Sequence, residues 1–166
     1  MNKSTNCQTS LAQLVTRGGI YYQISGGSRQ EIIANIIEKL KDKLPPRKND
    51  VLLQAIMERE ALISTGIENG IALPHPRTPM LEENEEPFVT IAFPLDPPDW
   101  ETPDNSKAHT VFLIVSESPK QHLHALTKIN FLCMQEKFYN LISSRAPKAE
   151  IIAAIEEAEK GWQNTN

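Results

Sequence analysis

The chain has 166 residues, 40% of them apolar and 23% charged, which indicates one soluble globular domain with a core of its own. A formal net charge of −4 argues against a nucleic-acid partner, because proteins that bind nucleic acids present a basic face. No apolar run approaches the ~20 residues that span a bilayer, so no membrane insertion is expected. Two cysteines, Cys7 and Cys133, are too few for a disulfide framework, and residues 1–10 lack the apolar core of a signal peptide. A cytoplasmic location follows.

The N-terminal region predicts a short helix and a strand behind a polar leader over residues 1–10. Apolar residues recur at helical spacing over 11–15, and Gly18-Gly19 ends that helix. Residues 20–24 are rich in β-branched and aromatic types, which favour a strand.

Two longer helices are expected next. Ser28 followed three residues later by Glu31 is a capping-box signature, and it opens a strongly periodic helix that Pro45-Pro46 stops. A second helix runs from about residue 49 or 50 through 60, again with an apolar face.

The second half of the chain predicts three strands and two helices, separated by polar connections at 78–87 and 94–109. The expected elements are a short strand at 71–73, core strands at 88–93 and 111–115, and helices at 119–140 and 147–160. Strands that alternate with helices predict an α/β fold with helices packed over a sheet. We expect a single layered domain over 11–160 and a tail at 161–166.

One histidine stands in an unusual local setting. His75 follows the short strand and lies between Pro74 and Pro76, which fix the backbone and give up two donors. A stiff strand end orients the imidazole, and orientation is a large part of any rate gain. A neutral imidazole is nucleophilic at cytoplasmic pH, because its ordinary pKa is about 6.5.

Several groups that bind anions precede this histidine. Arg59 offers a forked and permanently charged donor set, Ser64 and Thr65 bring hydroxyls, and the backbone at Gly66 and Gly70 lets an anion approach closely. Each feature has an ordinary structural explanation when taken alone, because Ser-Thr-Gly is usually a turn. The spacing of all of them together points to a phosphoryl site.

The stretch 59–75 contains Arg-Glu, then Ser-Thr-Gly, then Gly-Ile-Ala-Leu-Pro-His. It resembles the signature of the fructose/mannitol-type enzyme IIA domains of the bacterial phosphoenolpyruvate-dependent phosphotransferase system, including the stand-alone nitrogen-regulatory members. The resemblance extends more weakly over most of 11–160. Residues 119–132 carry the His-Leu-x-x-Leu pattern of that family, beginning at His122.

The resemblance implies a phosphotransferase that carries phosphate on His75. It makes His122 the second histidine, which orients the phosphoryl group, and Arg59 the residue that stabilises charge. Ser64 and Thr65 match the pair near the phosphate. The implied fold is a mixed β-sheet flanked by helices. The implied donor is the small carrier protein HPr, and neither a metal nor a cofactor takes part.

Some features match no family motif. The connection 94–109 departs from the pattern, and we interpret it as decoration rather than as a reshaped docking surface. His124 lies two residues after His122 and so points away from it on a helix. His109 is interpreted as structural and His124 as a surface residue. Arg77 has no assigned role.

Three classes of function are weighed. Within the carrier class there are two roles. In one, the phosphate passes to an enzyme IIB domain for sugar uptake; in the other, the phosphorylation state of His75 alters binding to a regulatory target. No IIB or membrane segment follows in the chain, which favours regulation. A binding module without transfer is the second class. A metal site built from the four histidines is the third, and the lack of a His-x-x-x-His or Cys-x-x-Cys pair disfavours it. The sugar, the acceptor and the oligomeric state stay open.

Overall fold

Helices and strands alternate along the chain. The computed structural model describes residues 9–45 and 48–164. The first half contains α1 (Leu11–Gly18), β1 (Ile20–Ile24), α2 (Arg29–Lys39), α3 (Lys48–Leu62), β2 (Gly66–Ile67) and β3 (Ile71–Ala72). The second half contains β4 (Phe88–Pro94), β5 (Thr110–Val115), α4 (Pro119–Cys133), α5 (Glu136–Ser143) and α6 (Lys148–Gln163). Within the described ranges, no helix is both long enough and apolar enough to cross a membrane.

The strands form one mixed sheet, as expected for the α/β class. Its order is β1-β4-β5-β3-β2. The pairs β1–β4 and β3–β5 are parallel, whereas β4–β5 and β2–β3 are antiparallel. The parallel pair β3–β5 matters for the site, because both strands end at the same edge of the sheet.

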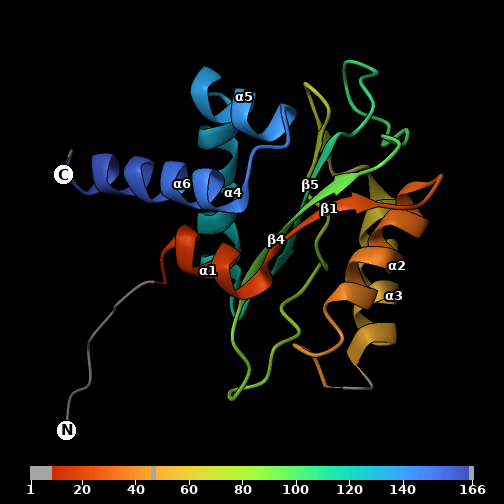
Figure 1. Cartoon of the computed structure of the whole chain (residues 1–166). Coiled ribbons are helices and arrows are strands. Elements are labelled where there is room, and N and C mark those ends of the chain that lie inside the picture. The colour runs from red at the N-terminus through yellow and green to blue at the C-terminus, as the bar shows by residue number, and fades with distance from the viewer. Residues whose placement is uncertain (1–8, 46–47, 165–166) are drawn as a thin grey trace, which may run out of the picture.

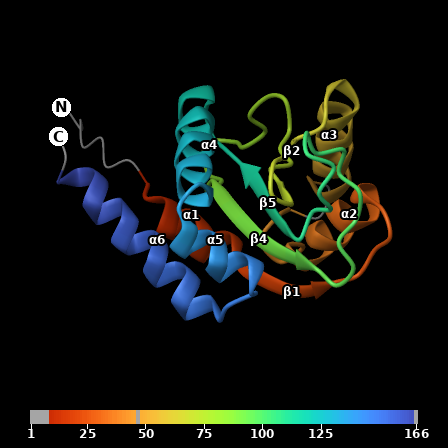
Figure 2. The same ribbon diagram turned by 90° about the horizontal axis from the view of Figure 1, so that it is seen from above.

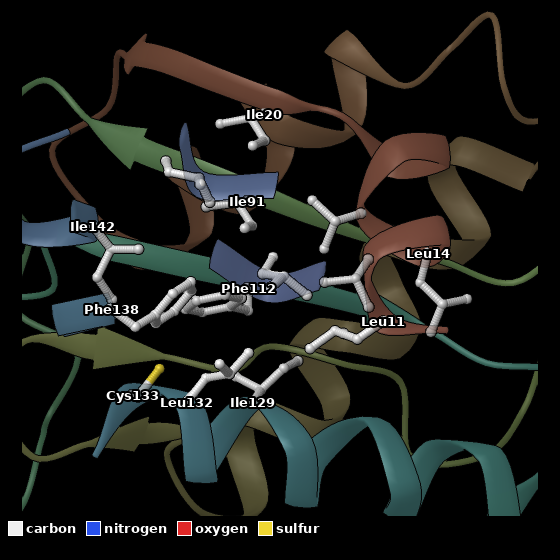
Figure 3. Packing of buried hydrophobic residues seen from close by; sticks show 14 of the residues in the cluster. Leu11, Leu14, Ile20, Ile91, Phe112, Ile129, Leu132, Cys133, Phe138 and Ile142 are labelled. Carbon is white, nitrogen blue, oxygen red and sulfur yellow. The ribbon is translucent and has the colours of Figure 1, made fainter. Parts of the chain in front are cut away.

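Helices cover both faces of this sheet, so the domain has three layers (Figures 1 and 2). One face packs against α1, α4, α5 and α6, with side chains such as Leu11, Phe112 and Ile129 in the core (Figure 3). The other face packs against α2 and α3. Cys133 lies in the first core, where burial raises the pKa of its thiol to about 12. Cys7 lies outside the described residues.

Local capping explains where the early helices begin. Ser10 and Gln13 form a complete capping box at α1, because each side chain bonds the other residue's backbone N–H. At α2, Ser28 accepts from the Glu31 N–H at 3.2 Å, but the Glu31 carboxylate accepts from Gly27 N–H at 2.6 Å instead of closing the box. The signature therefore marks the right helix start with only half of the box formed.

The structure differs from the sequence expectations at several element ends. The helix that opens at Ser28 ends at Lys39, ahead of Pro45, and Pro46 lies outside the described residues. The short strand β2 was not expected. The last helix continues to Gln163, into the segment expected as a tail.

The helix expected over 119–140 is two helices, with the break at Met134 and Gln135. Ile129 of α4 and Phe138 of α5 are both buried in the same core cluster. In one straight helix of about 3.6 residues per turn, these two side chains would lie on opposite faces. The break brings both to the core, so tertiary packing decides it and no glycine or proline marks it.

A buried carboxylate joins three helices at the N-terminus of α1. Glu159 of α6 is 8% exposed and accepts from the backbone N–H groups of Leu11 at 2.9 Å and Ala12 at 2.8 Å. The ammonium of Lys128 in α4 lies 2.9 Å from the same carboxylate. A negative charge is stabilised at this end of a helix by its free N–H groups and its dipole.

We expect Glu159→Gln to lower the free energy of unfolding by about 2 kcal/mol, because hydrogen bonds to a charged acceptor are lost and Lys128 stays without a counterion. Urea unfolding followed by circular dichroism measures this. Glu156→Gln is the matched control, since Glu156 is exposed on the same helix. Equal midpoints for the two variants would contradict the assigned role of Glu159.

Candidate functional site

His75 is held at the sheet edge where β3 and β5 end. The backbone N–H of Ile114 in β5 donates to the Pro74 carbonyl at 3.0 Å, and Leu73 N–H donates to the Thr65 carbonyl at 3.1 Å. His75 is 9% exposed, and its Nδ1 lies 2.7 Å from the Leu73 carbonyl. A carbonyl oxygen can only accept, so Nδ1 carries the proton and Nε2 of the neutral ring is bare.

His122 faces His75 from the first turn of α4. Ser118 caps this helix by accepting from the Gln121 N–H, and Pro119 occupies its first turn. The centroids of the two imidazole rings are 4.5 Å apart and their planes are inclined by 51°. Ser116, which directly follows β5, places its hydroxyl 3.4 Å from His122 Nδ1. The structure thus brings together two histidines that are far apart in the sequence.

Both imidazoles favour the neutral form. Burial lowers the pKa of His75, the Leu73 carbonyl opposes this shift, and the charges of Arg59 and Glu60 act in opposite directions. Burial lowers the pKa of His122 to about 4, with further contributions from His75 and Arg59. Desolvation disfavours the charged ring in each case. At pH 7 the site therefore holds two uncharged rings.

We expect His122 to titrate near pH 4 in the folded protein and near 6.5 in urea. Because the folded pKa lies below the unfolded one, the unfolded chain binds protons first, so stability falls as the pH drops from 6.5 toward 4. Imidazole ¹⁵N NMR over pH 3.5–8 would give the titration midpoint, and urea unfolding at several pH values would give the slope. A folded midpoint at or above 6.5 would refute the buried, neutral arrangement.

Arg59 and Glu60 lie near the end of α3, where their charges act on His75. The half-buried Arg59 donates from Nη1 to the Ile63 carbonyl at 2.8 Å, just beyond the helix end. Glu60 is 2% exposed. Its carboxylate accepts from the Thr65 hydroxyl and lies 3.7 Å from Arg29 Nη1. A buried carboxylate needs such partners.

The Ser-Thr-Gly turn is engaged in other contacts. The Ser64 hydroxyl donates to the Trp100 carbonyl and accepts from Gly66 N–H at 3.0 Å. The Thr65 hydroxyl donates to Glu60. A side chain at Gly66 would come within 2.9 Å of Thr102 Cγ2, so the turn lies close to the 94–109 connection. A role for these three residues in binding phosphate stays a prediction.

Exposed apolar side chains lie close in the sequence to Arg59 and His122, and the pocket that adjoins His122 is small. Leu62 and Ile63, which follow Arg59 closely, are 63% and 69% exposed, and Leu123 is 67% exposed. A pocket of about 170 Å³ adjoins His122, and Arg77 and Ser116 are among its lining residues. This is well below the ~300–1,000 Å³ of usual small-molecule sites.

The remaining histidines lie apart from this pair. His124 is exposed on α4. His109 is half-buried, and its Nδ1 lies 2.7 Å from the Thr110 hydroxyl. Both interpretations from the sequence agree with these positions. Across residues 9–45 and 48–164, no group of three or more His, Cys, Asp or Glu is arranged to hold a metal ion.

Sequence reasoning did not single out the contacts that orient the rings. The Leu73 carbonyl carries no side-chain signal, and only the flanking prolines mark that strand end. Ser116 is a polar residue directly after a core strand, which is a usable signal for a site at the sheet edge. Glu60 is part of the Arg-Glu pair in the sequence motif, but the sequence alone assigns it no role. A charged residue on the inner face of a helix indicates a buried ion pair.

The fold and the facing imidazoles define an α/β domain with a paired-histidine site at its sheet edge. Residues 13–158 match the family described as phosphoenolpyruvate-dependent sugar phosphotransferase system, EIIA 2. The chain belongs to this family, whose members are phosphotransfer components of that system.

Curated relatives include regulatory and sugar-specific proteins. The chain is 35% identical over 133 residues to the nitrogen regulatory protein of Escherichia coli, covering 77% of each chain. It is 27% identical to the nitrogen regulatory protein of Pseudomonas aeruginosa, covering 87% of this chain and 93% of that one. It is also 27% identical to the fructose-specific EIIABC component of Bacillus subtilis, of which it spans only 24%.

Solved structures show the same fold. Nitrogen regulatory protein IIA-Ntr from Neisseria meningitidis superimposes with a TM-score of 0.72 at 18% identity, covering 87% of this chain and 97% of that one. Mannitol enzyme IIA in its complex with phosphorylated enzyme IIB from E. coli gives a TM-score of 0.67 at 16% identity, covering 84% and 95%.

Proposed function

We propose that this chain is a phosphohistidine carrier that accepts a phosphoryl group on Nε2 of His75 from an HPr-type carrier protein. The observation that carries the proposal is the hydrogen bond from His75 Nδ1 to the Leu73 carbonyl, because it leaves the lone pair of Nε2 free. The depressed pKa of His75 keeps that lone pair available at neutral pH. Membership of a phosphotransfer family supports the same chemistry.

The transfer exchanges one nitrogen–phosphorus bond for another. The Nε2 lone pair of His75 attacks phosphorus in line, the bond to the donor's imidazole breaks, and that nitrogen regains its electron pair. Arg59 supplies positive charge to the phosphoryl oxygens. With Ser116 donating to Nδ1 of His122, the proton of His122 stands on Nε2 and is available to the phosphoryl group.

The turn 64–66 is proposed to add donors to the bound phosphoryl group. Ser64 and Thr65 must then exchange their present acceptors, the Trp100 carbonyl and Glu60, for phosphoryl oxygens. The Gly66 N–H, which now donates to Ser64, becomes a third donor. When the Thr65 hydroxyl leaves Glu60, the Glu60 carboxylate still has Arg29 as its ion-pair partner.

Protein partners fit this surface better than small molecules. Leu62, Ile63 and Leu123 are exposed and follow Arg59 or His122 closely in the sequence, and the adjoining pocket is small. We propose a cytoplasmic protein whose phosphorylation state is read by a regulatory target, which the extensive coverage of two nitrogen regulatory relatives supports. The alternative is transfer to an enzyme IIB domain for sugar uptake, which the fructose-specific relative supports.

The proposal is tested by incubating the folded chain with phosphoenolpyruvate, enzyme I and HPr and measuring its intact mass. We expect a gain of one phosphoryl group that is lost in acid. No gain with a cognate HPr would reduce the chain to a binding module. Transfer from the labelled chain to a purified fructose-type IIB domain would separate sugar uptake from regulation, because a regulatory carrier retains its phosphate there.

A further inference from the structure

Part of the connection 94–109 is packed into the hydrophobic core. Trp100 and Ala108 are fully buried in the core cluster on the α2 and α3 side of the sheet. Thr102 is 4% exposed, and its hydroxyl donates to the Ser106 carbonyl at 2.6 Å. The connection therefore has fixed positions from which to hold another segment, which the interpretation as decoration does not anticipate.

Two of its side chains hold the turn between β2 and β3. Asp104 Oδ2 accepts from Asn69 N–H at 2.9 Å. Ser106 donates its hydroxyl proton to Asp104 Oδ1 at 2.6 Å, and this leaves a lone pair that accepts from Gly70 N–H at 2.7 Å. Asp104 thus satisfies one turn amide directly and orients Ser106 toward the next.

The same turn is held from its other side. Asn69 and Gly70 adopt left-handed backbone angles, with φ of 65° and 73°. The Gly70 carbonyl accepts from His109 N–H at 2.8 Å, and His109 Nε2 lies 2.9 Å from the Asn69 carbonyl. A Cβ at Gly70 would stand 2.6 Å from the His109 ring, so only glycine fits the turn against this connection.

The turn is coupled to His75 through the β2–β3 hairpin. Gly66 pairs with Ala72 in this hairpin, and the next ladder bond runs from Leu73 N–H to the Thr65 carbonyl. The carbonyl of Leu73 is the acceptor for His75 Nδ1. A shift of the turn therefore moves the acceptor that sets the tautomer of His75.

We propose that Asp104 and Ser106 are positioning residues for His75, acting through the turn at Asn69 and Gly70 and the carbonyl of Leu73. This inference rests on the proposed function of His75. Asp104 touches no reacting atom in the described structure, and its contribution is to fix where the imidazole and its proton stand.

The test compares Asp104→Ala with Asp99→Ala. Asp99 lies in the same connection, and its carboxylate accepts from Glu101 N–H at 2.8 Å. Among the described residues it makes no hydrogen bond to the turn. Asp104→Asn keeps an acceptor for Asn69 and serves as the conservative rescue. Imidazole ¹⁵N NMR at pH 7 gives the share of His75 with its proton on Nδ1, and stopped-flow transfer from phosphorylated HPr separates kcat from KM.

For Asp104→Ala we expect kcat to fall about 10-fold to 100-fold with KM unchanged, because misplacement of a nucleophile affects the chemical step and the apolar docking surface is intact. The Nδ1-protonated share of His75 should fall as well, with Asp99→Ala unchanged and Asp104→Asn intermediate. If Asp104→Ala fails to fold, Ser106→Ala carries the same expectations, because it deletes only one hydroxyl.

An unchanged kcat and an unchanged His75 tautomer in the folded variant would overturn the inference. Failure of the proposed function is a separate result, in which the unaltered chain takes no phosphate from HPr. In that case the NMR comparison still decides whether Asp104 sets the tautomer of His75.

Discussion

Replacing His75 with alanine is expected to abolish phosphoryl labelling by HPr, with a loss of at least roughly 1,000-fold, because the attacking nitrogen is removed and no neighbouring group replaces it. His122 does not substitute in the proposed arrangement, because its Nε2 carries the proton and therefore donates to the phosphoryl group instead of attacking it. Intact mass after incubation with phosphoenolpyruvate, enzyme I and HPr measures the effect.

His124→Ala is the matched control for this result. It removes an exposed imidazole from the same helix that carries His122, so it leaves labelling unchanged. Circular dichroism of His75→Ala checks that the sheet edge stays folded, because His75 is 9% exposed and its removal leaves a small void. Acid-labile phosphate on a folded His75→Ala protein would place the acceptor elsewhere in the chain.

Local patterns were sufficient to predict most elements and the setting of His75. Helical spacing and capping signals lie within a few residues of one another, so α1, α2 and α3 are visible in the sequence. The signature around His75 is also local, and it places the imidazole at a strand end held by prolines. His122 came from resemblance, and the structure supplies the 4.5 Å between the two ring centroids.

The rest depends on contacts between residues far apart in the sequence. The break between α4 and α5 follows from the need to bury Ile129 and Phe138 in one core. Asp104 and Ser106 form hydrogen bonds to a turn about 35 positions earlier in the chain. From its composition alone, the connection that contains them is predicted to be a polar surface loop. The presence of Trp100 in this connection was the available sequence signal that it packs against the core, because a tryptophan side chain in a loop is seldom left fully exposed to water.

Replacing His122 with alanine is expected to leave His75 able to accept phosphate while slowing onward transfer by about 100-fold, the usual cost of one donor to a developing charge. The lone pair of His75 Nε2 does not depend on His122, because the Leu73 carbonyl fixes the tautomer. What is lost is a neutral ring that donates to the phosphoryl oxygens and fixes their direction. Single-turnover transfer to a purified acceptor domain measures it.

His122→Gln separates donation from ring packing. Its side-chain amide supplies an N–H donor at a similar reach, so we expect it to recover part of the transfer rate that alanine loses. Ser116→Ala should resemble a milder form of His122→Ala, since it removes the hydroxyl that lies 3.4 Å from Nδ1 and that we propose donates to it. If His122→Ala blocks labelling as completely as His75→Ala does, His122 takes part in the attack itself, and the division of roles between nucleophile and orienting donor is wrong.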